Sequence, residues 1–453
     1  MRPASARKAT CFSRTRAAMQ PSGMGRDRLP PPCGILHFTF DTRESTGTGA
    51  TGRSGFAAVF QQGSLPVPNA AKPPLGLTPF AAMLTQFFGF GIAAGLWAGS
   101  VPSVSAIAHM STSDIGLAFT LYTAAYILAM TLGGKGLSVA NPRRILLVGL
   151  PANAVALAML LLAQSSFAMT LSLAAVGLIM GLLDLVMNTE GTLIEADLGR
   201  PILARLHCSA STGTGIGALA GSAFALTVGP YASALLAIAV LTLSLIVVAA
   251  ATPDRAIVRA QRGGIWVAYS PALLALGIIF GIGSAGETSA SIWSARLLAE
   301  QAPQLAVIAG IGVSFFALCQ AAMRFMGDQL RRAFGDGRLV ALSLTTATAG
   351  FVTVGLSADF TTSVMGFALV GIGTAMQVPC LFALAARLHP RNGGAALSLV
   401  ATIGGAPRLV APWAFGEIAS RWSTGASFGA IAIAFLIAIG LALMTQVRRP
   451  SIA

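Results

Sequence analysis

Charged residues are scarce in this chain. Asp, Glu, Lys and Arg make up 10% of the 453 residues, 55% are hydrophobic and the mean hydropathy is +0.76. Soluble domains average about 25% charged residues. The length alone would suggest about three soluble domains, but the composition excludes that reading and indicates a membrane protein.

Groups for covalent or metal chemistry are few and badly spaced for such roles. The five cysteines are scattered without a CxxC spacing, and three of them lie in apolar stretches, which is typical of small packing residues. No metal-ligand spacing or P-loop occurs, and no strand-to-helix turn is predicted that would form a nucleophile elbow. The sequence therefore predicts no enzyme activity, no metal site, no cofactor and no ATP-driven transport.

The net charge of +14 could suggest nucleic-acid binding. However, the basic residues are divided between the N-terminal segment and short loops, with no compact basic domain. We therefore expect the loop charges to orient the chain in a lipid bilayer and to contact anionic lipid, and we expect no nucleic-acid partner.

The first 78 residues differ from all that follow. They are rich in Arg, Pro, Ser, Thr and Gly and carry no sustained helical period, so they are predicted to be a disordered tail. No continuous apolar run of signal-peptide length occurs in them. An organelle transit peptide and a start codon assigned too far upstream are alternative explanations of this segment.

Apolar stretches long enough to cross a bilayer fill the rest of the chain, since a span needs about 20 helical residues. Twelve are predicted, at about 80–101, 115–133, 145–164, 168–190, 206–227, 231–251, 271–291, 304–325, 338–356, 361–386, 395–417 and 426–445.

Lys and Arg fall almost entirely into alternate gaps between these stretches. The remaining gaps hold only Arg296 and Arg421. Short loops rich in Lys and Arg stay on the cytoplasmic side. We therefore predict a multi-pass protein of the inner (plasma) membrane with both termini in the cytoplasm.

A polar break divides the spans into two sets of six, and a basic loop follows the second span of each set. These loops read GGKGLSVANPRR and MRFMGDQLRRAFGDGR. The predicted parts are a tail (1–78), a first half (79–251), a central cytoplasmic loop (252–264), a second half (265–447) and a C-terminal tail (448–453).

Two parallel six-helix halves with these loops resemble the major facilitator superfamily. The run Gly181–Gly221 is similar to its YbjJ-type and fucose-permease-like branch. The resemblance implies an all-α fold of twelve transmembrane helices in two pseudo-symmetric halves, with a site between them at mid-membrane. Four positions depart from the pattern of that branch: Ser100, Ile292, Gly405 and Arg408.

Polar residues inside predicted spans are the site candidates, because a charge near the bilayer centre costs about 2.5–3.5 kcal/mol on insertion scales. Asp184 and Asn188 share one face of span 4. Glu287 lies in span 7, and Arg408 in span 11 is expected to face a central cavity and pair with Asp184 or Glu287. These four are the predicted substrate or proton ligands; a structural hydrogen bond between helices is the alternative for Asp184 and Asn188.

A second set of candidates lies near the cytoplasmic ends of the spans and is expected to serve gating or the loop network. Glu195 is expected to pair with Arg200 or Arg205. The predicted gating or loop residues are Glu190, Glu195, His207, Arg143, Arg324 and Asp328.

The sequence thus predicts a secondary transporter that moves a small polar solute such as a sugar or related metabolite. We expect alternating access, coupling to protons and a monomer. A proton-coupled exporter of drugs or metabolites is the main alternative. A non-transporting membrane sensor or scaffold is the alternative of another class.

Overall fold

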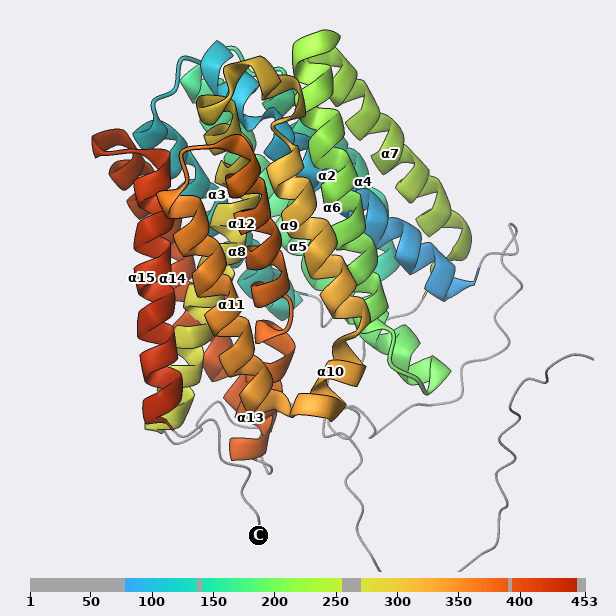
Figure 1. Cartoon of the computed structure of the whole chain (residues 1–453). Coiled ribbons are helices and arrows are strands. Elements are labelled where there is room, and N and C mark those ends of the chain that lie inside the picture. Colours follow the sequence, from blue (N-terminus) through green and yellow to red (C-terminus); the bar gives the residue numbers. More distant parts are fainter. Residues whose placement is uncertain (1–77, 137–140, 255–269, 390–392, 446–453) are drawn as a thin grey trace, which may run out of the picture. The chain divides into compact units, whose positions relative to one another are not determined.

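The computed structural model describes residues 78–136, 141–254, 270–389 and 393–445. Almost all of the predicted N-terminal tail, most of the central loop and the C-terminal tail lie outside these residues. The described chain is helical throughout (Figure 1). This agrees with the predicted all-α fold class.

Six helices make up the part of the chain before the central loop. They are α2 (Pro79–Ile107), α3 (Thr112–Gly136), α4 (Pro142–Leu161), α5 (Ser166–Leu198), α6 (Leu203–Thr227) and α7 (Pro230–Ala251). Several begin with proline, whose missing N–H is tolerated in a first turn. The side chains of Thr78, Asn141 and Ser165 accept hydrogen bonds from backbone N–H groups at the starts of α2, α4 and α5.

The part after the central loop contains more and shorter elements. They are α8 (Pro271–Gln301), the 3₁₀ helix η1 (Pro303–Ile308), α9 (Ile311–Phe325), α10 (Gly327–Phe334), α11 (Asp336–Leu356), α12 (Phe360–Thr374), α13 (Gln377–Leu388), α14 (Gly393–Arg421) and α15 (Thr424–Met444). The short helices α10 and α13 lie at one end of the bundle (Figure 1).

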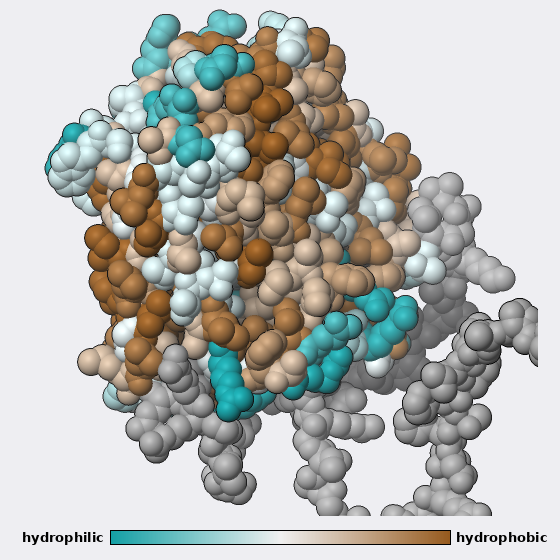
Figure 2. Space-filling model, viewed as in Figure 1, coloured by the Kyte–Doolittle hydropathy of each residue, from teal (hydrophilic) through white to brown (hydrophobic). Residues whose placement is uncertain are grey.

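Eleven segments of the described chain are long and apolar enough to cross a membrane. They correspond to every predicted span except 206–227. That span is the 25-residue helix α6, which is rich in Gly, Ser and Thr and packs against both α2 and α9. Because a helix enclosed by other helices needs little apolar surface, α6 completes the set of twelve despite its lower hydropathy. On the face seen in Figure 2, apolar side chains cover the flank between two ends that carry more hydrophilic residues.

The predicted continuous span at 361–386 is broken in the structure. Helix α12 ends at Thr374 and α13 begins at Gln377. Pro379 explains the break, because its ring clashes with the carbonyl four residues earlier, at Ala375, and it has no N–H to donate. In a membrane, such irregular backbone is tolerated only where protein or a water-filled space surrounds it, and Thr374 and Gln377 are both buried.

Helix packing repeats between the two parts of the chain. In the first, α2 packs on α6, α3 on α5 and α4 on α7; in the second, α8 packs on α14, α9 on α12 and α11 on α15. Contacts between the two parts run mainly through α3 with α14 and α6 with α9. This pairing is that of two pseudo-symmetric six-helix halves; their residue limits remain as predicted from the sequence.

Close packing of α6 depends on small residues. Gly213, Gly217 and Gly221 form a stripe along α6. A Cβ added at any of the three would overlap the backbone of α2. A Cβ on Gly217 would lie 2.9 Å from the Cα of Ile92. The stripe therefore allows α6 and α2 to approach closely, as small residues four apart commonly do in membrane helices.

Candidate functional site

Asp184 and Asn188 lie on one face of α5, one turn apart. The Asn188 amide donates a 2.9 Å hydrogen bond to Asp184 Oδ1, and the Tyr126 hydroxyl of α3 donates a 2.6 Å hydrogen bond to Asp184 Oδ2. Each carboxylate oxygen thus has a donor. The predicted helix-to-helix hydrogen bond between spans 4 and 2 is present, and it does not exclude ligand binding at the same carboxylate.

Tyr122 and Tyr126 are site residues that the sequence analysis missed. They belong to a row of neighbouring aromatic rings: Trp97 lies 5.9 Å from Phe119, Phe119 lies 6.1 Å from Tyr122, and Tyr122 lies 6.0 Å from Tyr126, measured between centroids. The available signal was their spacing, since two of only four tyrosines in the chain stand four residues apart within one predicted span.

Glu287 is paired, but not with Arg408 as predicted. The Arg324 guanidinium of α9 lies 3.6 Å from Glu287 Oε1 on α8 and donates a 2.9 Å hydrogen bond to Ser211 Oγ on α6. Arg324 was assigned to the loop network, and this is a correction. Helix α9 ends at Phe325, so Arg324 is still within the helix and its long side chain reaches the acid on α8.

Gln320 extends this network to the broken helix. One turn before Arg324 on α9, it accepts a hydrogen bond from Ser211 Oγ at 3.3 Å and donates one to Thr374 Oγ1 at 3.3 Å. Gln377, at the start of α13, donates to the Gly373 carbonyl across the break. The break therefore lies next to the Glu287–Arg324 pair.

Arg408 forms no direct ion pair with the two acids to which it was assigned. It lies near enough to Asp184, Glu287, Tyr122 and Tyr126 to interact with them electrostatically. Within the described residues, however, no carboxylate comes within 4.0 Å of its guanidinium, and its buried Nε has no hydrogen-bond partner. The predicted ion pair of Arg408 with Asp184 or Glu287 is thus not seen among the described residues.

Glu195, one of the gating candidates of the first half, caps the start of the next helix. Glu195 does not pair with Arg200 or Arg205; instead its Oε2 accepts hydrogen bonds from the backbone N–H groups of Ile202 and Leu203 at 2.7 and 3.0 Å. The reason for this correction is that α5 continues to Leu198, which brings Glu195 against the exposed N–H groups that begin α6.

The other first-half candidates have distinct surroundings. Glu190 is fully buried in α5. His207 packs edge-on against Phe87 of α2, with ring centroids 5.4 Å apart. Arg143 donates a 2.7 Å hydrogen bond to the Ala249 carbonyl and so connects α4 to α7 within the first half.

Asp328 lies in the first turn of α10, where a carboxylate is favoured by the helix dipole. Asp336, eight residues later, was missed by the sequence analysis, and it forms ion pairs with two arginines. Buried Asp336 pairs with Arg331 at 2.7 Å and Arg387 at 2.6 Å, and so joins α10, α11 and α13. This network was not among the predicted loop residues, and the role predicted for Asp328 stays a prediction.

Trp293 joins α8 to α14 through a pair of aromatic rings. It is fully buried, and its indole stacks on Phe415 of α14 at 4.6 Å between centroids. Helix α8 continues to Gln301, ten residues beyond the predicted end of the span, so Trp293 lies inside the bundle.

The two halves are in close contact at one end of the bundle. Ser113, near the start of α3, donates a hydrogen bond to Glu417, near the end of α14. One turn further in, a Cβ on Gly116 would lie 2.7 Å from the Pro412 carbonyl oxygen and 2.8 Å from the Gly416 Cα. At the other end of α14, near its first residue, the packing is open: a Cβ on Gly394 would meet nothing within 4 Å.

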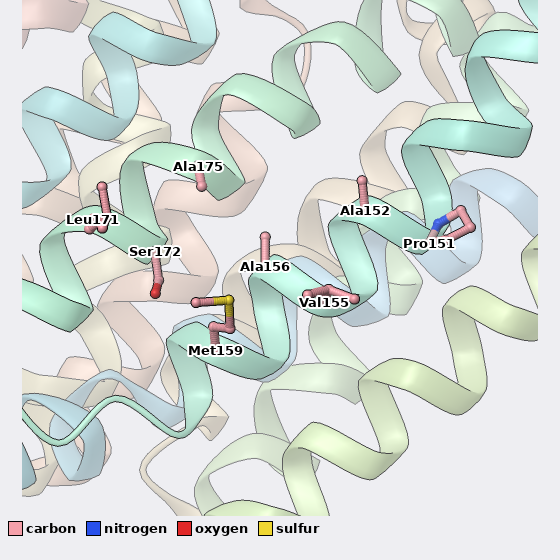
Figure 3. A pocket seen from close by; sticks show the side chains of 8 residues that line it. All are labelled: Pro151, Ala152, Val155, Ala156, Met159, Leu171, Ser172 and Ala175. Carbon is pink, nitrogen blue, oxygen red and sulfur yellow. The ribbon is translucent and has the colours of Figure 1, made fainter.

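A pocket of about 430 Å³ lies between α4 and α5, away from Asp184, Glu287 and Arg408. Figure 3 shows its lining, which is apolar apart from Ser172: Pro151, Ala152, Val155, Ala156, Met159, Leu171, Ser172 and Ala175. None of the candidate site residues lines it.

Comparisons with known proteins agree with this architecture. No family model matches the chain. An uncharacterized MFS-type transporter of Yersinia pestis is 27% identical over 370 residues, which cover 81% of this chain and 95% of that protein. The membrane protein MosC of Rhizobium meliloti is 28% identical over 363 residues, covering 80% of this chain and 87% of MosC.

Among solved structures, a point mutant of the nucleoside transporter NupG is similar, with a TM-score of 0.67 and 12% identity; the match covers 82% of this chain and all of NupG. The chain therefore has the major facilitator fold, as predicted. Over most of its length the chain is thus similar to an MFS-type transporter and to a membrane protein, and its apolar helices are those of a multi-pass membrane protein.

Proposed function

We propose that this chain moves a small polar solute, such as a sugar or related metabolite, across the inner membrane by alternating access, coupled to protons. The observation that carries the proposal is a charged cluster inside an apolar bundle. It is defined here by Asp184, Glu287, Arg324 and Arg408, which come from both halves. Burying these groups is unfavourable, so their retention favours a function that uses them.

The contacts between the halves support alternating access. Ser113–Glu417 and Gly116–Gly416 hold the halves together at the end that carries the α2–α3 and α14–α15 connections. With both termini in the cytoplasm, as the loop charges predict, this is the outer end. We therefore propose that the structure represents an inward-facing state and that the α3–α14 contact opens during transport.

The aromatic row supports a polar solute with an apolar face. Tyr126 contacts Asp184, and the aromatic row continues from it through Tyr122. Sugars commonly stack on aromatic rings while their hydroxyls bind carboxylates and amides. Asp184 is also the group proposed to bind the proton. A carboxylate inside the membrane can gain and lose a proton during a transport cycle, and such residues often form proton relays in transporters.

The test uses the full chain in proteoliposomes that enclose a pH-sensitive dye. A panel of hexoses, pentoses, sugar acids and nucleosides is added outside without an imposed gradient. The proposal expects at least one solute to drive proton entry. Asp184→Asn should abolish that signal, whereas the exposed control Asp359→Asn, at the start of α12, should keep it.

The direction of proton movement separates the alternatives. Proton movement opposite to that of the solute would identify the proton-coupled exporter instead. If no solute of the panel or of a hydrophobic-drug panel moves protons or is itself accumulated, the result favours the sensor or scaffold.

A further inference from the structure

Among the described residues, Arg408 is the member of the charged cluster that has no ion pair within 4.0 Å. Asp184 receives hydrogen bonds from Tyr126 and Asn188, and Glu287 pairs with Arg324. Both acids thus have donors that do not involve Arg408. Over the described chain, no hydrogen bond reaches its guanidinium, and its Nε is buried and unsatisfied.

An arginine held in this way is unfavourable without compensation. Inside a membrane protein, a charged side chain pairs with another charge or with backbone carbonyls, or it faces water. The half-buried Arg408 lies within electrostatic reach of Asp184 and Glu287 yet makes contact with neither. Its donors are therefore available to a group that enters from outside.

Room for such a group exists beside Arg408. Gly405 precedes it by three residues, so the two lie on the same face of α14. A Cβ on Gly405 would meet nothing within 4 Å, whereas a Cβ on the neighbouring Gly404 would overlap the Phe280 ring. The helix is therefore tightly packed on the Gly404 side and open on the side of Arg408.

We propose that Arg408 binds an anionic group of the transported solute, a carboxylate or a phosphate, which occupies the space beside Gly405. A guanidinium offers two parallel donors that match the two oxygens of either group. This inference rests on the proposed transport function and narrows its substrate class from polar solutes in general to acidic ones, such as sugar acids or sugar phosphates.

The first experiment measures the electrostatic potential beside Arg408 and needs no knowledge of the substrate. A cysteine is introduced by Gly405→Cys, and its reaction rates with an anionic (sulfonatoethyl) and a cationic (trimethylammonioethyl) methanethiosulfonate are compared in detergent-solubilised full chain. The unmodified chain gives the background of its own cysteines. We expect the anionic-to-cationic rate ratio to fall at least tenfold when Arg408→Gln is added.

Arg421→Gln is the matched control, because Arg421 lies at the end of the same helix, exposed and paired with Glu417. It should leave the rate ratio at the introduced cysteine unchanged. A ratio that does not respond to Arg408→Gln, or a cysteine that neither reagent reaches, would overturn the inference.

The second experiment identifies the anion with three matched sugars: glucose, glucuronate and glucose 6-phosphate. Each is tested for protection of the introduced cysteine and for transport by the unmodified chain. Protection by glucuronate alone identifies a carboxylate, and protection by glucose 6-phosphate alone a phosphate; either should disappear in Arg408→Gln. Equal protection by glucose, or protection by none, would refute an acidic substrate.

Failure of this inference and failure of the proposed function give different results. If neutral sugars drive proton entry and acidic ones do not, the transporter stands and the anion site is wrong. If the potential at the introduced cysteine depends on Arg408 but no solute moves, the anion site stands and transport is wrong.

Discussion

The Arg324 guanidinium on α9 lies 3.6 Å from the Glu287 carboxylate on α8, and both side chains are about one-fifth exposed. The same guanidinium donates to Ser211 of the other half. The ion pair therefore connects the interior of the second half to its interface with the first, at the place where α12 breaks from α13.

Removal of either partner should destabilise the protein more than removal of both. Glu287→Gln or Arg324→Gln alone leaves an uncompensated buried charge, which typically costs about 3–5 kcal/mol. The double variant should recover most of the loss. Melting temperatures of the detergent-solubilised full chain measure this, with Glu300→Gln in the exposed Arg296–Glu300 pair as the control that changes little.

Additive losses in the double variant would show that Arg324 and Glu287 act independently. The sequence-based expectation was different, namely that Arg408 pairs with Asp184 or Glu287. If Glu287→Gln restored function to Arg408→Ala, the result would favour an Arg408–Glu287 pair in another conformational state.

The Tyr126 hydroxyl should matter for proton coupling where that of Tyr122 does not. Tyr126→Phe removes the 2.6 Å hydrogen bond to Asp184 Oδ2, and loss of a bond to a charged group is worth about 1.5–3 kcal/mol. We expect solute-driven proton entry to fall about tenfold or more. Tyr122→Phe is the matched control, since it removes a hydroxyl one turn away on the same helix.

Equal effects of Tyr126→Phe and Tyr122→Phe on proton entry would contradict a specific role of the hydrogen bond. They would indicate instead that the aromatic row acts through its packing or its overall polarity. Expression and melting temperature of both variants separate that outcome from misfolding.

Much of the fold could be predicted because the bilayer imposes simple rules. Stretches of about 20 apolar residues and alternating loop charge gave the helices and their order, and even the Gly-rich α6 was found. The break between α12 and α13 was missed although Pro379 stands in the sequence. Proline in a transmembrane helix can be tolerated, so the residue alone does not decide between a kink and a break.

The candidate site was predicted only in part, because side-chain partners depend on helix rotation and reach. Hydropathy placed Asp184, Glu287 and Arg408 inside the membrane. It could not show that Arg324, near the end of its helix, reaches Glu287 and leaves Arg408 without a direct partner. Nor could it show that α5 extends far enough for Glu195 to cap α6.

Loop orientation is predicted by the positive-inside rule and is not fixed by the fold itself. Single cysteines placed in Thr252–Gly264 should be labelled by an impermeant maleimide only in inside-out vesicles. Arg255, Arg259 and Arg262 are expected to hold this loop in the cytoplasm. A cysteine replacing Ser357, between α11 and α12, serves as the opposite control and should be labelled in intact cells. The reverse pattern would invert the topology and make the structure outward-facing.

The close approach of α3 and α14 should be specific to one conformational state. In Gly116→Val, the added side chain would overlap the Pro412 carbonyl and the Gly416 backbone, so the halves could not close at this end. We expect transport to fall at least tenfold while membrane insertion is unchanged. Gly440→Val is the control, because a Cβ at Gly440 on α15 meets nothing within 4 Å.

The same variant also predicts where the protein opens. A cysteine replacing Ser113, which contacts Glu417 across the two halves, should react slowly with an impermeant maleimide added outside intact cells. Reaction should become several-fold faster in Gly116→Val, because the blocked closure exposes this end, and should stay slow in Gly440→Val. If Gly116→Val transports normally and Ser113→Cys is no more reactive, the α3–α14 contact is a permanent packing contact and alternating access must use another hinge.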